Sequence, residues 1–375
     1  MKRPSKEVSV SVFARTDAGM QRAENEDAFM VADLTTGNVG IGAKMSTHRV
    51  GERGSLMVVS DGMGGAAAGE IASSMAVKTI REALMEPLTE DDCGRLKMAT
   101  ELANQRIWEY AKENRKFTGM GATLTAVLVH NTSAYVAQVG DSRAYLMRSG
   151  QVKQLTKDQS LVQLLIDSGS VTPEQANSVP QNVIMQALGT SETVEVAMVS
   201  VELYKDDVLL ACTDGLSNKV TPEEMGKILT ESENLNAACR RLVELANERG
   251  GEDNITVISA RFDGEALHSA AQSNSITGSF KVLSEGCFDS DLSEMSKRFA
   301  SSVKSPQAED VTTRVLNTPR PAGSPPIDDK KPIPANQPQR KPRSTANRNF
   351  LILVIAILGI LFVLAAGYFF LRSVK

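Results

Sequence analysis

Short runs of apolar residues, several of them alternating with polar ones, recur between Val8 and Asp263. Runs of this length and period predict β-strands that bury one or both faces. The clearest are VSVSVFA, DAFMVAD, SLMVVS, TLTAVLVH, SAYVAQVG, RAYLMR, VEVAMVSVEL, DVLLAC and NITVISARF. Short turn sequences separate them, so this part of the chain is predicted to form β-sheets.

Other segments repeat apolar residues at the spacing of one helix face, which predicts amphipathic helices. They span residues 66–84, 93–114, 159–168, 222–229 and 235–248. The stretch SAYVAQVGDSRAYLMRSGQVKQL places successive strands on either side of tight turns, which is typical of an antiparallel meander. Strands and helices do not alternate as βαβ units, so we predict an α+β fold with antiparallel sheets and the helices outside them.

The composition is that of a globular protein. The chain has 375 residues, of which 42% are hydrophobic and 23% charged, enough for one large domain with additional segments. Its formal charge is -4, and no basic stripe occurs before the C-terminal quarter, which argues against nucleic acid as a partner. The four cysteines form no CxxC pair, so neither a zinc site nor a disulfide framework is predicted; they are Cys93, Cys212, Cys239 and Cys287.

The composition changes after Asp263, which marks the end of a predicted compact domain, 8–263. Residues 264–349 are rich in Ser, Thr and Gln and then in Pro. Such a segment buries too little apolar surface to offset the entropy lost on ordering, so we expect a flexible tether.

A last segment, residues 350–371, carries no charge. At about 1.5 Å per residue it spans the roughly 30 Å hydrocarbon core of a bilayer, which predicts one transmembrane helix and makes the lipid bilayer a partner. The N-terminus lacks the apolar run of an export signal. Basic residues before the predicted helix favour the cytoplasmic side, so we expect a membrane protein with its globular domain in the cytoplasm; these residues are Arg340, Lys341, Arg343 and Arg348.

Acidic residues recur in one local context, the turn beside a predicted strand. VVSDGMGG contains Asp61, VAQVGDSRAY contains Asp141, VLLACTDGL contains Asp214, GGEDNITVIS contains Asp253, and NEDAF contains Glu26 and Asp27. Taken singly, each is an ordinary acidic residue in a turn. Taken together, strand ends at one edge of a sheet converge, and clustered carboxylates repel unless cations neutralise them. Because the ligands would all be oxygens, Mg²⁺, Mn²⁺ or Ca²⁺ is favoured over zinc.

The glycines of VVSDGMGG allow two interpretations. A glycine-rich turn after a strand can expose N–H groups to phosphate, but such loops usually carry a Lys or open onto a helix N-terminus. The carboxylate of Asp61 would instead repel phosphate and attract a hard cation, so the motif favours a metal site.

An ordered series of motifs makes the interpretation more specific. Along the chain the motifs occur in the order RAENED, SDGMGG, GMGATL, VGDSRAY, LTKDQSLV, QALG, CTDGL and GGEDNITV. The series resembles the metal-dependent Ser/Thr protein phosphatases of the protein phosphatase 2C family, and DGMGG resembles their bacterial branch. The resemblance covers residues 8–263. It implies a four-layer α-β-β-α sandwich of two antiparallel sheets flanked by helices, with two Mn²⁺ or Mg²⁺ ions at one edge.

The resemblance also implies ligands for the two metals. Asp61 would bridge both ions, and the carbonyl of Gly62 would bind one of them. Asp214 and Asp253 would complete the protein ligands of the other ion.

Further roles follow from the same resemblance. Glu26 and Asp27 would hold metal-bound waters or ligate at the second ion, and Asp141 would contribute to a third, weaker metal site. Arg22 would bind the substrate phosphate. Arg22 and Asp61 are therefore the catalytic residues that the resemblance implies.

The implied activity is hydrolysis of phosphoserine and phosphothreonine on proteins by metal-activated water, without a phosphoenzyme. Phosphorylated proteins would be the substrates, and the enzyme would oppose a Ser/Thr protein kinase at the membrane. The alternative is a catalytically silent scaffold that binds phosphoproteins, which loss of a metal-binding acid would favour; none is lost. Two positions depart from the family pattern, because Gln159 and Val179 stand where His is usual, close to a flap beside the active site.

Overall fold

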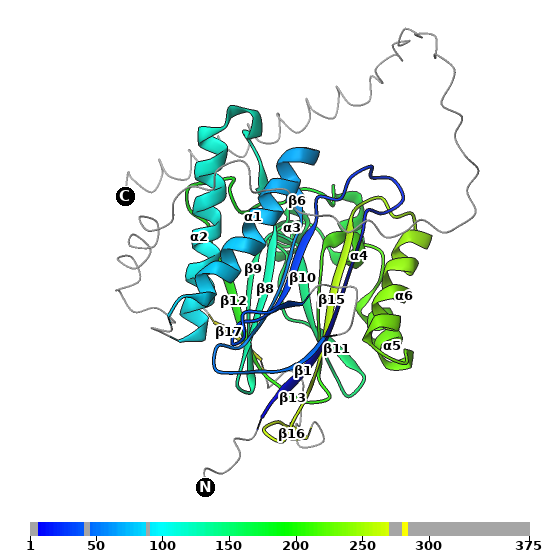
Figure 1. The fold of residues 1–375 in the computed structure, drawn as a ribbon. Helices are drawn as coiled ribbons and strands as arrows, with labels where there is room; N and C mark the ends of the chain where they lie inside the picture. Colours follow the sequence, from blue (N-terminus) through cyan, green and yellow to red (C-terminus); the bar gives the residue numbers. More distant parts are fainter. Residues whose placement is uncertain (1–6, 41–45, 88–90, 270–279, 284–375) are drawn as a thin grey trace, which may run out of the picture. The chain divides into compact units, whose positions relative to one another are not determined.

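The computed structural model describes residues 7–40, 46–87, 91–269 and 280–283. Two β-sheets stack face to face, and helices cover the outer face of each (Figure 1). Each pair of neighbouring strands in these two sheets is antiparallel. The antiparallel sheets with external helices predicted from the sequence are therefore confirmed.

The first sheet has six strands. In spatial order they are β11 (Gln151–Gln154), β10 (Arg143–Arg148), β14 (Val208–Cys212), β15 (Ile255–Asp263), β1 (Ser9–Asp17) and β4 (Ser46–Arg49). The two longest strands, β1 and β15, pair along their whole length from Ser9↔Asp263 to Asp17↔Ile255. This register aligns the N-terminal end of β15 with the C-terminal end of β1.

The second sheet has seven strands. In spatial order they are β17 (Phe280–Leu283), β12 (Ala197–Glu202), β9 (Ser133–Val139), β8 (Leu124–His130), β5 (Ser55–Ser60), β2 (Ala28–Asp33) and β3 (Val39–Gly40). Two short ribbons complete the strands of the described residues; they pair β6 (Gly62–Met63) with β7 (Gly121–Ala122) and β13 (Tyr204–Lys205) with β16 (His268–Ser269).

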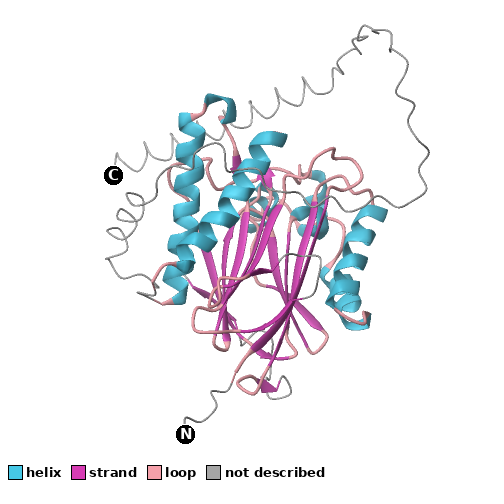
Figure 2. Cartoon of the chain, in the orientation of Figure 1, coloured by secondary structure: helices cyan, strands magenta, loops and turns pink. Residues whose placement is uncertain are grey.

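Two pairs of helices form the outer layers (Figure 2). The seven-stranded sheet is covered by α1 (Ala66–Met85) and α2 (Asp92–Glu113), and the six-stranded sheet by α5 (Pro222–Glu231) and α6 (Leu235–Glu248). Polar caps fix three of the four N-termini, since the side chains of Asp91, Thr221 and Asn234 accept hydrogen bonds from backbone N–H groups of the first turn. Shorter helices are η1 (Arg115–Phe117), α3 (Leu161–Asp167), η2 (Pro173–Ser178) and α4 (Asp214–Ser217).

The four layers enclose three apolar cores, one between the sheets and one under each helix pair. Strand β5 contributes side chains to two of these cores. Leu56 and Val58 pack under α1 and α2, whereas Met57 and Val59 face the central core. Because both faces of this strand are buried, its sequence is a continuous apolar run rather than an alternating one.

The fold continues past the predicted domain end at residue 263, where we expected a tether. Strand β16 pairs with β13, and β17 forms the edge of the seven-stranded sheet beside β12. Phe280 packs against the central core and Leu283 against the core under α1 and α2. The expectation is wrong for these residues because FKVL is too short, and its surroundings too polar, to stand out as a strand.

The predicted transmembrane segment 350–371 and most of the predicted tether lie outside the described residues. Among the helices that the structure does describe, none is long and apolar enough to cross a bilayer.

Candidate metal centre and active site

Two predicted site residues lie at one edge of the seven-stranded sheet. Asp27 directly precedes β2 and Asp61 directly follows β5. The two strands are antiparallel neighbours in which Ala28 pairs with Ser60. The sheet register therefore brings Asp27 and Asp61 together, although 34 positions separate them in the chain.

Two more carboxylates lie at the ends of two central strands of the six-stranded sheet. Asp214 follows β14 after one residue, and Asp253 precedes β15 by one residue. These strands are antiparallel neighbours, with Cys212 paired to Val257. The same register argument places Asp214 beside Asp253, as predicted from the sequence.

Hydrogen bonds join the two sheets at this edge. Asp27 precedes a strand of one sheet, and its Oδ2 accepts hydrogen bonds from two residues of the other: Thr213 Oγ1 at 2.9 Å and Thr256 Oγ1 at 2.6 Å. Asp141, in the turn between β9 and β10, is also brought to the group and is only 6% exposed. The predicted convergence of these carboxylates is thus what the fold produces.

Burial and mutual repulsion raise the pKa values of the cluster. Burial, followed by the charges of Asp27, Asp214, Asp253 and Asp141, raises the pKa of Asp61 well above its usual range. Burial raises the pKa of Asp27 to about 7 and that of Asp141 to about 7, with Asp214 adding to both shifts. Burial and Asp253 likewise raise the pKa of Asp214. The site therefore disfavours the ionised form of these carboxylates.

Three carboxylate oxygens in this cluster are buried without a hydrogen-bond donor: Oδ1 of Asp27, of Asp141 and of Asp214. Buried anionic oxygens are costly unless a donor or a cation satisfies them. An all-oxygen set of this kind suits Mg²⁺ or Mn²⁺. The donor chemistry therefore fits divalent cations, even though no three acidic, His or Cys side chains of the described residues form a finished ligand cage.

Arg22 and Glu26 lie at the rim of the cluster. Arg22 Nη2 is 2.9 Å from Asp253 Oδ2, and its Nε donates to the carbonyl of Glu252. Burial raises the pKa of Glu26, while the charge of Arg22 opposes that rise. Arg22 is about half exposed, so a guanidinium group faces solvent beside the carboxylates.

Gly62 is confined by backbone on two sides. A Cβ at this position would overlap the carbonyl of Gly69 in the first turns of α1 and come within 2.7 Å of the Glu26 carbonyl oxygen. Close packing of α1 against the strand end therefore requires glycine here. The role of the Gly62 carbonyl as a ligand stays a prediction.

Several residues that support the cluster were not singled out from the sequence. The Asp61 N–H donates to Thr123 Oγ1 at 3.0 Å, and the Asp61 carbonyl accepts from the Thr123 N–H at 2.8 Å. Asn254 accepts from the Glu26 N–H at 2.7 Å and donates to two carbonyls of the preceding loop. Asn254 has a signal in the sequence, because it is a polar residue directly before an apolar strand run.

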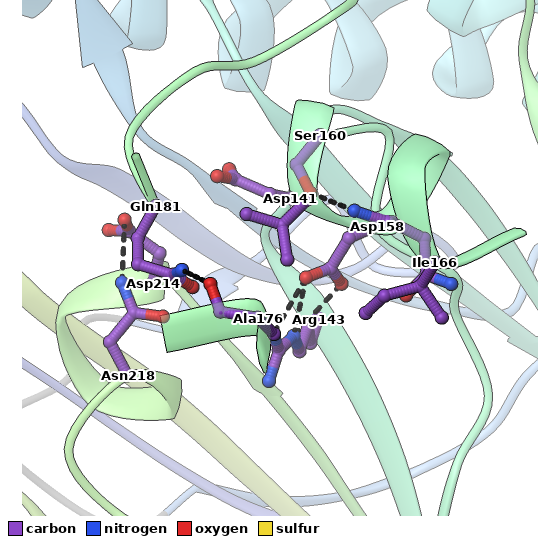
Figure 3. Close-up of a pocket in the computed structure, with 11 residues that line it drawn as sticks. Asp141, Arg143, Asp158, Ser160, Ile166, Ala176, Gln181, Asp214 and Asn218 are labelled. Atoms are coloured by element: carbon purple, nitrogen blue, oxygen red, sulfur yellow. Dashed lines mark hydrogen bonds and ion pairs between the residues drawn. The ribbon is translucent and has the colours of Figure 1, made fainter. Parts of the chain in front are cut away.

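A pocket of about 200 Å³ adjoins the cluster (Figure 3). Asp141 and Asp214 line it together with residues of α3 and η2. Its floor includes a two-pronged ion pair, in which the Nε and Nη2 of Arg143 contact the carboxylate of Asp158 at 2.6 to 3.1 Å. Although burial alone would lower the pKa of Arg143, the hydrogen bonds to Asp158 raise it, so this cation is held charged.

Residues 159–186, which we call the flap segment, begin and end beside the Asp141 turn. Gln159 Oε1 accepts from the Gly140 N–H at 2.7 Å and from Gln186 Nε2 at 3.1 Å. Gln159 thus ties both ends of the segment to the turn that carries Asp141. Val179 ends η2, with its N–H bonded to the Ala176 carbonyl and its side chain half-buried.

Cys212 is the thiol nearest to the cluster along the chain, and it is fully buried in β14. Burial raises its pKa to about 12. A neutral, enclosed thiol is a poor nucleophile, so Cys212 serves packing.

Comparison with known proteins shows which family the chain resembles. The pattern of the family described as protein phosphatase 2C matches residues 44–253. The serine/threonine phosphatase stp of Listeria welshimeri is 36% identical over 249 residues, covering 65% of this chain and 92% of the relative. The serine/threonine protein phosphatase PstP of Mycobacterium tuberculosis is 38% identical over 248 residues, which is 66% of this chain but only 44% of PstP.

A solved structure gives the same result in three dimensions. The catalytic domain of PstP in complex with two manganese ions superposes with a TM-score of 0.57 at 34% identity, covering 68% of this chain and 99% of that one. Fold, motif series and carboxylate cluster agree. The chain belongs to the protein phosphatase 2C family.

Proposed function

We propose that this protein is a metal-dependent phosphatase that hydrolyses phosphoserine and phosphothreonine on proteins. One observation carries the proposal: carboxylates from both sheets meet at one edge, buried, with raised pKa values and three oxygens that lack any donor. A divalent cation pair would neutralise these charges. Family membership and the manganese ions of the PstP structure support the same cofactor.

The family resemblance implies a role for each carboxylate, and its position is compatible with that role. Asp61 directly follows β5 and would bridge two ions, with Gly62 offering its carbonyl beside it. Asp214 and Asp253 would hold the ion on the side of the six-stranded sheet. When bound, the metals supply an activated water as nucleophile and offset the charge of the phosphate.

The remaining site residues surround this pair. Glu26 and Asp27 would orient water or contribute ligands at the second ion, and Asp141 would contribute to a third, weaker site facing the pocket. These assignments rest on the family resemblance, and the unsatisfied oxygens of Asp27 and Asp141 support them.

Arg22 would bind the substrate phosphate. Its guanidinium is half exposed, and its Nη2 contacts Asp253. If a bound cation engaged the Asp253 carboxylate, the N–H groups of Arg22 would no longer be needed as its partner. They would then be available to donate hydrogen bonds to phosphate oxygens. In this arrangement metal binding and phosphate binding favour each other.

The test is hydrolysis of a chromogenic aryl phosphate and of a phosphothreonine peptide by the full chain. We expect turnover with Mn²⁺, loss of turnover with EDTA, and recovery when Mn²⁺ is added in excess. Asp214→Asn should reduce kcat/KM by about a thousandfold, because it removes a metal ligand. Asp263→Asn, at the far end of β15, is the matched control and should retain activity. Full activity of Asp214→Asn would contradict the assignment of Asp214 as a metal ligand. Phosphopeptide binding without turnover would favour the scaffold alternative.

We further propose that residues 8–283 form the phosphatase domain and that the chain continues through a tether to a single transmembrane helix at 350–371. The uncharged length of that run and the basic residues before it support this topology. The domain would then face the cytoplasm, where it would oppose a membrane-associated Ser/Thr kinase. A domain that resists protease added to the cytoplasmic face of vesicles, but not to the other face, would contradict the orientation.

A further inference from the structure

The side chain of Asp27 is held by the sheet to which Asp27 does not belong. Asp27 directly precedes β2 of the seven-stranded sheet. Its Oδ2 accepts hydrogen bonds from Thr213, which follows β14, and from Thr256 of β15, and both of these strands belong to the six-stranded sheet. Both threonines are fully buried. Their hydroxyl groups are therefore enclosed donors at the place where the two sheets meet.

Contacts with the backbone fix the hydroxyl group of Thr213. Its Oγ1 accepts the Thr256 N–H at 3.0 Å, and the Thr213 N–H donates to the Thr256 carbonyl at 3.1 Å. A hydroxyl group has a single proton, and an ionised carboxylate can only accept. The proton of the Thr213 hydroxyl is therefore directed to Asp27, 2.9 Å away.

A chain of hydrogen bonds fixes the hydroxyl group of Thr256. Its Oγ1 lies 2.6 Å from Asp27 Oδ2 and 2.8 Å from Thr16 Oγ1. Because its single proton goes to the carboxylate, the proton between the two hydroxyl groups belongs to Thr16. Thr16 Oγ1 in turn accepts from Asn25 Nδ2 at 2.8 Å, and Asn25 Oδ1 accepts the Asp27 N–H at 3.1 Å. The hydrogen bonds thus form a closed ring with one direction, which begins and ends at Asp27.

The two carboxylate oxygens of Asp27 therefore have different surroundings. Oδ2 receives hydrogen bonds from both threonines, whereas Oδ1 is buried and has no donor. Asp27 lies beside Asp61, because Ala28 pairs with Ser60. With Oδ2 engaged, Oδ1 is the oxygen left for a cation, and the carboxylate cannot exchange the two oxygens without breaking both hydrogen bonds.

We propose that Thr213 and Thr256, which we call the threonine clamp, are positioning residues that orient Asp27 for a divalent cation at Oδ1. The proposal rests on the proposed phosphatase function and deepens it, because two residues of one sheet organise a metal-binding side chain of the other. The threonine clamp raises metal affinity, since the carboxylate is already ordered when the cation arrives.

The experiment measures the apparent Mn²⁺ affinity of the full chain by isothermal titration calorimetry, and thermal melting in EDTA checks that each variant is folded. Thr213→Val and Thr256→Val each remove a hydroxyl group with little change of shape, whereas Thr213→Ser and Thr256→Ser retain it. Thr16→Val weakens the threonine clamp from an exposed position. The matched control is Thr100→Val, because Thr100 is equally buried, in α2, and its hydroxyl group donates to the Leu96 carbonyl at 2.9 Å.

We expect Thr213→Val and Thr256→Val each to bind Mn²⁺ about tenfold more weakly than wild type, and the two Ser variants to stay within about twofold of wild type. Thr16→Val should bind Mn²⁺ about threefold more weakly, because the Thr256 hydroxyl group loses its donor. Thr100→Val should melt at a lower temperature but keep the Mn²⁺ affinity of wild type.

Three results would contradict the proposal. Wild-type Mn²⁺ affinity in Thr213→Val and Thr256→Val, or equal losses in the Ser and Val variants, would overturn the positioning role alone. If the two buried Val variants did not fold, unchanged Mn²⁺ affinity in Thr16→Val would overturn it. Absence of Mn²⁺ binding by wild type would overturn the metal-dependent function and this proposal with it.

Discussion

Two regions adjoin the same pocket but are built in opposite ways. One is the flap segment, and the other is the carboxylate edge, by which we mean the strand ends that carry Asp27, Asp61, Asp214 and Asp253. The carboxylates follow or precede buried strands, and paired registers and hydrogen bonds from threonines hold them. The flap segment has no buried residue in its helix and is tied to the sheets at its two ends, near Gln159 and Gln186. The proposed metal ligands are thus placed on rigid strand ends, whereas the flap segment is exposed and has little core to preserve.

The first prediction concerns the rigid side and has the largest effect. Asp61→Asn should lower activity by about a thousandfold, because it removes the proposed bridging ligand of the two metals. The same change should stabilise the metal-free fold by about 1–2 kcal/mol, because it removes a carboxyl group whose ionised form is disfavoured by burial and by four other carboxylates. Thermal melting in EDTA would record this as a rise of about 2–5 °C for a domain of this size.

The control for this prediction is Asp263→Asn, an exposed carboxylate at the far end of β15 that pairs with Lys205. It should leave activity intact and should not raise the melting temperature. If Asp61→Asn melted at a lower temperature than wild type in EDTA, the metal-free cluster would stabilise the fold. That result would contradict the prediction that the cluster destabilises the fold until cations bind.

The site residues could be predicted because their signal is local. Each acidic residue stands beside an apolar strand run, and once adjacent strands are antiparallel, strand ends must share an edge. The supporting residues Thr123, Thr213 and Thr256 were harder to find, because threonine is an ordinary strand residue and only the pairing of distant strands shows what it contacts.

The second prediction concerns pH. In the fold the pKa of Asp27 and of Asp141 is about 7, whereas in the unfolded chain it returns to the ordinary value of 3.8. Between these values the folded state binds more protons than the unfolded state, so the free energy of unfolding falls as pH rises. We expect metal-free protein to melt roughly 5 °C lower at pH 7.5 than at pH 5.5.

Adding Mn²⁺ provides a second measurement for the same prediction. Mn²⁺ at pH 7.5 should restore the lost stability, because it binds the deprotonated carboxylates. Glu224 does not interfere, since hydrogen bonding to Arg249 lowers its pKa to about 2 and its contribution is constant above pH 5. A melting temperature in EDTA that rose from pH 5.5 to 7.5 would contradict the raised pKa values.

The parts of the fold that escaped prediction have weak local signals. Strands such as β6, β7 and β13 contain two residues each, and β17 lies in a Ser-rich stretch, so tertiary pairing alone defines them. Helix α3 was predicted within two residues, but its lack of burial was not, because an apolar helix in a sequence is ordinarily taken to face a core. Burial depends on what lies opposite, which periodicity does not report.

The third prediction concerns the connection between the two regions and has the smallest effect. Gln159→Ala removes the side-chain acceptor of the Gly140 N–H and the contact to Gln186. The connection between the flap segment and the Asp141 turn is then weaker, because only the backbone bond from the Gln159 N–H to the Gly140 carbonyl remains there. Loss of one such hydrogen bond should reduce kcat/KM for a phosphopeptide by about fivefold, mainly through KM, and leave aryl phosphate hydrolysis within about twofold. Gln159→His, which retains a ring nitrogen as acceptor, should recover most of the loss. Equal losses in the Ala and His variants would show that packing at residue 159, rather than the bond to Gly140, links the flap segment to the carboxylate edge.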